Sequence, residues 1–123
     1  MSSFFIVLTA DQKAYNGTLH QTFDRPYRLS GEWEMALTCI KYQKSEQCFV
    51  FCDLVDYSHV ANEKMQFLDF VDSRMTRNNY PRYVKVIRKR FNSINITIRE
   101  KLLDVSPHLS DSDVTCVLHF RKA

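Results

Sequence analysis

The sequence predicts an all-β protein of about eight antiparallel strands in a two-sheet jelly-roll sandwich, with residues 1–123 as a single domain. Three observations lead to this prediction. First, the chain has 9 Phe and 6 Tyr among its 123 residues, and aromatic side chains suit a pleated, half-buried surface. Second, short apolar or alternating runs recur between polar breaks. Third, the sequence has neither an internal repeat nor the alternation of strands and helices that builds parallel sheets.

The N-terminal part contains the first two expected strands. Residues 3–9 (SFFIVLT) are a short apolar run, and the strong turn pair Asn16-Gly17 follows. Residues 18–29 (TLHQTFDRPYRL) alternate weakly and include Pro26. Because proline cannot donate a hydrogen bond to a strand ladder, the second strand is expected at a sheet edge or at a bulge.

The stretch LSGEWEMALTCIKY, residues 29–42, fits two structures. Its Glu, Met, Ala and Leu favour a helix, whereas its alternation favours a strand. We predict a strand after a break at Ser30-Gly31, because tertiary context overrides a weak helix preference. The side chains expected to face the core are Trp33, Met35, Leu37 and Cys39. Glu32 and Glu34 then lie on the solvent side of the sheet.

The remaining strands are expected over residues 48–60, 63–73, 83–91, 93–99 and 114–121, with loops at 77–81 and 106–113. Residues 63–73 also fit a helix stripe. The run SINITIR at 93–99 alternates most cleanly and places three isoleucines on one face. Together these runs give the eight strands of a jelly roll.

An immunoglobulin-like sandwich is the main rival architecture. Its core has a tryptophan that lies between two cysteines along the chain. Here Trp33 precedes all the cysteines, which are Cys39, Cys48, Cys52 and Cys116. The order of these residues therefore favours the jelly roll.

Glycine and cysteine usage excludes several classes of protein. The only glycines are Gly17 and Gly31, so neither a Walker A loop nor a dinucleotide fingerprint is present. The N-terminal apolar run is too short for a signal peptide, and no stretch is long enough to span a bilayer. We therefore expect synthesis in a reducing compartment, with free thiols. On one strand face, Cys48 and Cys52 would lie ~13 Å apart, too far for a disulfide.

Residues with catalytic or metal-binding chemistry do not form a convincing site. Cys48 and Cys52 are also too far apart to share a zinc ion, and no second pair has zinc-finger spacing. Cys116 and His119 stand three residues apart, so on a strand they point to opposite faces. The paired carboxylates Glu32 with Glu34, and Asp53 with Asp56, are ordinary surface choices. We expect no enzymatic activity, metal or cofactor.

Positive charge is concentrated in one segment. Nine basic residues and one acid lie between Arg74 and Lys101, although the whole chain is only +3. The candidate patch comprises Arg77, Arg82, Lys85, Arg88, Lys89 and Arg90, interleaved with Tyr80, Tyr83 and Phe91. Basic residues beside aromatic ones are typical of sequence-tolerant binders of single strands. An acidic protein surface is an alternative partner, and charge that merely protects a sheet edge is another explanation.

Several stretches together resemble a known family. The pattern comprises Leu29, Gly31, Trp33, Glu34, Leu37, Ile40 and Tyr42. It is followed in order by FCDLV (51–55), YPRYVKV (80–86), FNSINITIRE (91–100) and VLHFRK (117–122), the last with His119, Phe120 and Arg121. This arrangement resembles the penton-like minor capsid proteins of Polinton/Maverick elements and adintoviruses. Members of that family are usually longer, with a large middle segment where this chain has QKSEQCFV at 43–50.

The resemblance implies a virion structural protein, a single jelly roll made in the host cytoplasm or nucleus and not secreted. It implies self-assembly, for example as a pentamer, and contact with other capsid proteins. We expect the basic segment 82–90 to meet an acidic neighbour or the genome, and Asp53, Asp56, Asp69 and Asp72 to supply complementary charge. The alternative hypothesis is a small β-sandwich binding module that uses residues 77–91 to hold nucleic acid or an acidic protein.

Overall fold

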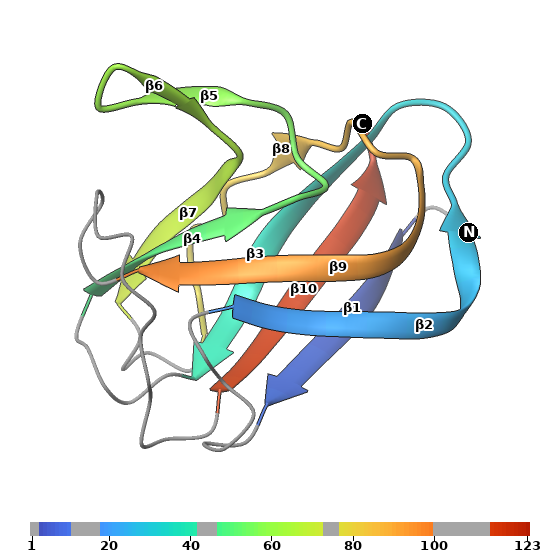
Figure 1. Cartoon of the computed structure of the whole chain (residues 1–123), viewed down its shortest axis with the longest axis horizontal. Coiled ribbons are helices and arrows are strands. Elements are labelled where there is room, and N and C mark those ends of the chain that lie inside the picture. Colours follow the sequence, from blue (N-terminus) through green and yellow to red (C-terminus); the bar gives the residue numbers. More distant parts are fainter. Residues whose placement is uncertain (1–2, 11–17, 42–46, 73–76, 100–113) are drawn as a thin grey trace.

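The computed structural model describes residues 3–10, 18–41, 47–72, 77–99 and 114–123 (Figure 1). The strands in this part of the chain are β1 Ser3–Ala10, β2 Thr18–Arg28, β3 Trp33–Lys41, β4 Gln47–Cys52, β5 Ser58–Val60, β6 Glu63–Met65, β7 Phe67–Asp72, β8 Val84–Lys85, β9 Arg90–Arg99 and β10 Val114–Lys122. Eight of them form two four-stranded sheets, and β5 and β6 form a separate hairpin. Figure 1 shows this hairpin projecting from the sandwich at the top left of the view.

The strand order is that of a jelly roll. Sheet A has the order β1-β10-β3-β8, and sheet B has the order β2-β9-β4-β7. The first strand pairs with the last, β2 with β9, β3 with β8 and β4 with β7, always antiparallel. This nested pairing results when one long hairpin is wound into two facing sheets, and the predicted fold class is confirmed. No helix in the described residues is long and apolar enough to cross a membrane.

The two predicted edge features of β2 are both present. β2 lies at the end of sheet B, as Pro26 predicts. Its register with β9 shifts between Thr22 and Tyr27, so the proline lies within an irregularity of the ladder. Gly31 follows with a φ of +85°, a left-handed conformation that glycine adopts without strain. The predicted break before β3 is therefore a real turn.

The strand predicted for LSGEWEMALTCIKY is confirmed, but one of its core residues is wrong. Val117 of β10 lies opposite Cys39, and the next residue, Leu118, lies opposite Leu37, so Thr38 is an extra residue in β3. Such a bulge reverses the alternation beyond it. Ile40 is consequently buried, and Cys39 is only half-buried.

Other element boundaries also need correction. The run 48–60 is not one strand, because β4 ends at Cys52 and the chain turns before β5. Residues 63–72, the described part of the expected strand 63–73, contain two strands and no helix, with β6 and β7 separated by Gln66. In the run 83–91, the short β8 is followed by irregular backbone until β9 begins. Loop 77–81 is outside any strand, whereas the turn at 16–17 and the loop at 106–113 lie outside the described residues.

Four aromatic rings connect the two sheets within the core. Phe4 stacks on Phe120, with centroids 4.8 Å apart, and Phe120 packs on Phe91 at 6.0 Å. Phe91 stacks on Tyr27 at 5.2 Å, and Tyr27 returns to Phe4 at 5.4 Å. Each ring comes from a different strand, two from sheet A and two from sheet B. Stacked aromatic pairs add to the stabilisation from buried area, so this cluster of four stacked side chains fixes how the sheets face each other.

Candidate functional site

The edges of the two sheets are protected to very different degrees. An edge strand exposes backbone groups that pair readily with another chain, and charges, prolines, bulges or shortness prevent this. The edge strand β2 has Pro26, a bulge and charged residues. At the opposite edge of sheet B, the Arg82 guanidinium donates hydrogen bonds of 3.1 Å to the carbonyls of Phe67 and Leu68 in β7. In sheet A, the edge strand β8 is only two residues long.

The edge strand β1 has none of these protections. Its eight residues, SFFIVLTA, include no charge and no proline, and they pair with β10 along their whole length without a bulge. Among the described strands, nothing pairs with its other edge. On the outer face, Phe5 is 61% exposed and Val7 is 56% exposed. β1 is therefore a long, regular, apolar edge, the kind that associates with another strand.

An aromatic cluster adjoins Phe5 on the outer face of sheet A. The Phe5 ring stacks on His119, with centroids 4.5 Å apart, and the hydroxyl of Tyr83 is hydrogen-bonded to His119 Nδ1 at 2.7 Å. The guanidinium of Arg121 lies 3.4 Å from the Tyr83 ring centroid. Its Nε donates to Glu34 at 2.6 Å. The family-pattern residues Glu34, His119 and Arg121 thus share one surface.

The other residues of the family pattern have structural positions. Trp33, Leu37 and Phe120 are buried in the core, and Gly31 makes the turn before β3. The Trp33 indole N–H donates to the carbonyl of Ser30 at 2.9 Å, which holds the same turn from within the chain. The family pattern therefore contains residues that pack the core and residues that form one exposed surface, namely Glu34, His119 and Arg121.

A hollow of about 580 Å³ lies beside this cluster. Phe5, Tyr83 and His119 line it together with the segment 77–79. Most of its lining surface is apolar, and the Arg77 side chain also lines it. An aromatic or aliphatic side chain from a partner is a suitable occupant, because interface anchors fill such pockets.

The predicted basic patch is divided in the structure. Lys85 and Lys89 both lie near Glu32, with Nζ to carboxylate distances of 3.8 and 3.4 Å. Arg88 pairs with Asp53 at 3.1 Å. Arg77, in contrast, is exposed beside the hollow on sheet A. At least three of the six cations are therefore engaged by acids of their own chain.

The acids expected to complement this patch act largely within the chain. Asp53 pairs with Arg88, and buried Asp69 accepts hydrogen bonds from the side chain of Asn78 and from the backbone N–H groups of Phe70 and Arg82. Asp56 is exposed and accepts a bond from the next backbone N–H. The side chain of Asp72 lies outside the described residues. For Arg88, the acidic partner is therefore in its own chain.

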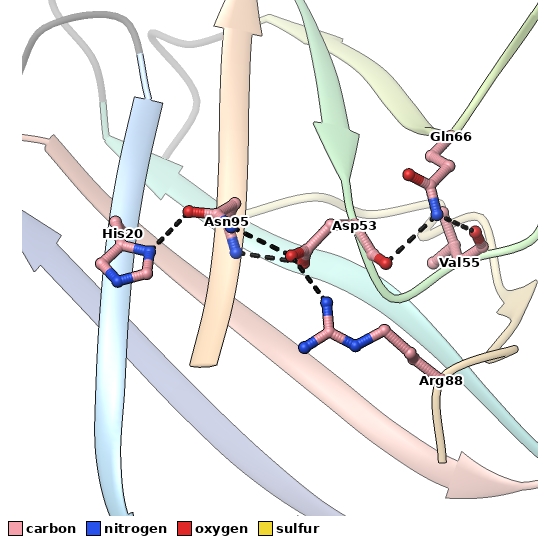
Figure 2. A network of polar contacts seen from close by, with 6 residues as sticks. All are labelled: His20, Asp53, Val55, Gln66, Arg88 and Asn95. Atoms are coloured by element: carbon pink, nitrogen blue, oxygen red, sulfur yellow. Dashed lines mark hydrogen bonds and ion pairs between the residues drawn. The ribbon is translucent and has the colours of Figure 1, made fainter. Parts of the chain in front are cut away.

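A polar network covers the outer face of sheet B (Figure 2). Asn95 of β9 bonds to His20 of β2 and donates from its backbone and side-chain nitrogens to Asp53, at 3.1 and 3.0 Å. Arg88 completes the charge balance of Asp53, and Gln66 donates to the carbonyls of Asp53 and Val55. Figure 2 shows His20, Asn95 and Asp53 in a row that continues toward Gln66, with Arg88 reaching Asp53 from one side of the row. Both Asp53 oxygens are engaged, so the network orders the turn after β4.

The thiols and the buried carboxyl are poorly suited to catalysis. Burial raises the pKa of Cys52 to about 12, and burial also raises the pKa of Cys116 strongly. A thiol with a raised pKa is a weak nucleophile near neutral pH. Cys116 is buried and His119 lies on the outer face, which confirms that they point apart. All four cysteines lie in described strands, and none forms a disulfide.

Within the described ranges, no group of three or more His, Cys, Asp or Glu side chains is placed to hold a metal ion.

The features that sequence reasoning missed are the unprotected β1 edge and the position of Arg28 opposite Arg90 in the β2–β9 ladder. The lack of charge in residues 3–10 was visible in the sequence, whereas the register of β2 against β9 was not.

No family model matches the chain, and no curated protein matches its sequence.

Proposed function

We propose that this chain is a non-enzymatic structural subunit of a virion, a penton-like single jelly roll that assembles with copies of itself through the β1 edge. The observation that carries the proposal is the contrast between β1 and the other three edge strands. β1 alone among the described edges is long, regular and uncharged. The jelly-roll winding and the sequence resemblance to Polinton and adintovirus minor capsid proteins support the same function.

Pairing along β1 satisfies two physical requirements at once. The backbone N–H and C=O groups on its outer edge gain partners, and the exposed Phe5 and Val7 lose contact with water. Full burial of one such side chain stabilises an interface by about 1.5–3 kcal/mol. The hollow next to Phe5 accepts a further anchor from the neighbour.

The geometry of the contact determines the size of the assembly. If β1 pairs with β1 of a second copy, the contact is isologous and closes as a dimer. If β1 meets a different surface, the contact is heterologous, and it builds a ring such as a pentamer when the rotation between neighbouring copies closes. Both arrangements bury the same edge. Both leave other surfaces of the subunit free for contact with other capsid proteins.

Sedimentation velocity across a range of protein and salt concentrations tests the proposal. We expect an oligomer that persists at high salt, because an apolar contact is not screened as an ion pair is. Electron microscopy of the same sample distinguishes rings from dimers. A protein that stays monomeric at every protein and salt concentration contradicts the proposal.

A further inference from the structure

Two arginines lie directly opposite each other on the outer face of sheet B. Arg28 of β2 is the register partner of Arg90 of β9, and both are exposed. The neighbouring pair, Tyr27 and Phe91, stacks in the core, so the arginine pair faces outward. Side chains in such a pair start about 5 Å apart, and like charges at this position destabilise the sheet.

The basic residues next to this pair have acidic partners, but the pair itself does not. Lys85 and Lys89 share Glu32, and Arg88 has Asp53. Within the described part of the chain, neither Arg28 nor Arg90 makes an ion pair. A cross-strand pair of uncompensated arginines fits an anion that bridges the two guanidinium groups.

We infer that Arg28 and Arg90 bind a phosphate of a single-stranded nucleic acid that lies along the outer face of the β2–β9 pair. Beyond the arginines, the facing pairs are Thr22 with Ser93, His20 with Asn95 and Thr18 with Thr97, and Arg99 ends β9. The outward side of β9 therefore carries no acid over its ten residues. A strand of that length extends over roughly 30 Å, which accommodates several nucleotides.

The composition of this face favours nucleic acid over an acidic protein. Its outward side chains on β2 and β9 are mostly Thr, Ser, Asn, His and Arg, which bond to phosphate and sugar oxygens. A protein interface instead depends on buried aromatic or aliphatic anchors. The aromatic residues of these strands, Phe23, Tyr27 and Phe91, pack with the core. The exposed acids nearest to Arg28 in sequence are Asp24 and Glu32, and Glu32 already contacts Lys85 and Lys89. Asp53, which contacts Asn95 on this face, is paired with Arg88.

This site does not depend on the proposed assembly. The arginine pair lies on the outer face of sheet B, whereas Phe5 and Val7 lie on the outer face of sheet A. The two faces look away from each other across the sandwich, so both are available in the same subunit. Failure of one proposal leaves the other to be tested separately.

Fluorescence anisotropy with a labelled mixed-sequence single-stranded DNA of about 20 nucleotides tests the inference. The variant Arg28→Gln/Arg90→Gln is compared with Lys85→Gln/Lys89→Gln, which removes the same charge from residues paired with Glu32. We expect the arginine variant to bind about tenfold or more weakly at low salt, and its salt slope to fall by roughly 0.7, because the pair neutralises one phosphate. The lysine variant is expected to bind within about threefold of wild type.

Thermal unfolding without nucleic acid supplies a second readout. Removing the like-charge pair is expected to leave the fold intact and to raise Tm slightly, so weakened binding is not misfolding. The inference is overturned if wild type does not bind the oligonucleotide at low salt, or if both variants lose affinity equally. It is also overturned if the arginine variant loses self-association while its oligonucleotide affinity is unchanged, because the pair would then contact an acidic protein surface.

Discussion

The side-chain amide of Asn78 donates a 3.0 Å hydrogen bond to Asp69 Oδ2 in β7 and a 2.8 Å hydrogen bond to the carbonyl of Leu37 in β3. Its backbone N–H also donates to the carbonyl of Thr38, at 2.9 Å. One residue outside the strands thus joins sheet B to sheet A, next to the bulge that redirects β3. The loop that contains it also lines the hollow beside Phe5.

Asn78→Ala is expected to lower the free energy of unfolding by about 2 kcal/mol, because the Leu37 carbonyl loses the Asn78 donor and Asp69 Oδ2 keeps only the longer 3.4 Å bond from the Arg82 N–H. Urea denaturation measures this change. Asn79→Ala, at the exposed neighbouring position, is the control and is expected to change stability by less than about 0.5 kcal/mol. Equal stability of both variants would contradict the linking role of Asn78.

Asp69 gives the fold a specific pH dependence. Burial raises the pKa of its carboxyl, and the hydrogen bonds from Phe70, Asn78 and Arg82 oppose that rise without cancelling it. The folded state therefore binds this proton more tightly than the unfolded chain does. Its contribution to stability is fully present below the unfolded pKa of about 3.9 and is lost as pH rises through the raised folded-state pKa.

The measurement is the difference in unfolding free energy between wild type and Asp69→Asn across this pH range. We expect the wild-type value to fall relative to the variant as pH rises, because the variant cannot titrate at this position. A difference that is constant, or that grows in favour of wild type with rising pH, would show that burial does not disfavour the charged carboxylate of Asp69.

The four cysteines are expected to react at different rates. Cys48, Cys52 and Cys116 are buried, whereas Cys39 is half-buried on the outer side of the bulge in β3. Iodoacetamide followed by peptide mass spectrometry on native protein should modify Cys39 first. Cys52 should react far more slowly than Cys39 at both pH 7 and pH 9, because its burial and a pKa raised to about 12 leave a very small thiolate fraction at either pH. Rapid alkylation of Cys52 in the folded protein would contradict its burial.

Phe120 is expected to be a principal determinant of stability. It is fully buried and stacks on Phe4 and Phe91, from both sheets. Phe120→Ala should lower the unfolding free energy by about 3–5 kcal/mol. Phe70→Ala, at a ring that is 44% exposed on β7, provides the control with a loss below about 1.5 kcal/mol. Chemical denaturation distinguishes the two variants. Similar losses would refute the importance of the four stacked aromatic side chains between the sheets.

Most of the fold could be predicted from sequence because alternation and edge chemistry are local properties. The isoleucines of β9 face the core as their spacing predicts, and Pro26 places β2 at an edge. The bulge at Thr38 could not be predicted, since it arises from the register of β3 against β10. That single extra residue exchanges Cys39 for Ile40 in the core.

The surfaces were less predictable because each depends on partners distant in sequence. The basic segment was visible as a cluster of charge, but its lysines meet Glu32, more than fifty residues earlier in the chain. Arg28 and Arg90 come together through strand register alone. Asn78 has no motif around it, and its role follows from the gap between two sheets that it bridges.

The substitution Val7→Lys places a charge in the middle of the edge through which assembly is proposed, and so it tests assembly through β1. Val7 is 56% exposed in the single chain, so a lysine there is accommodated in the fold but introduces an unpaired charge into the proposed contact. We expect association to weaken by at least about 3 kcal/mol, or about a hundredfold in Kd. Ile87→Lys, at a 42% exposed position outside the strands, is the matched control.

Sedimentation velocity of wild type, Val7→Lys and Ile87→Lys at equal concentration provides the measurement. We expect an oligomer for wild type and Ile87→Lys and a folded monomer for Val7→Lys. An oligomer of unchanged size and affinity for Val7→Lys, with folding confirmed by circular dichroism, would contradict assembly through the β1 edge.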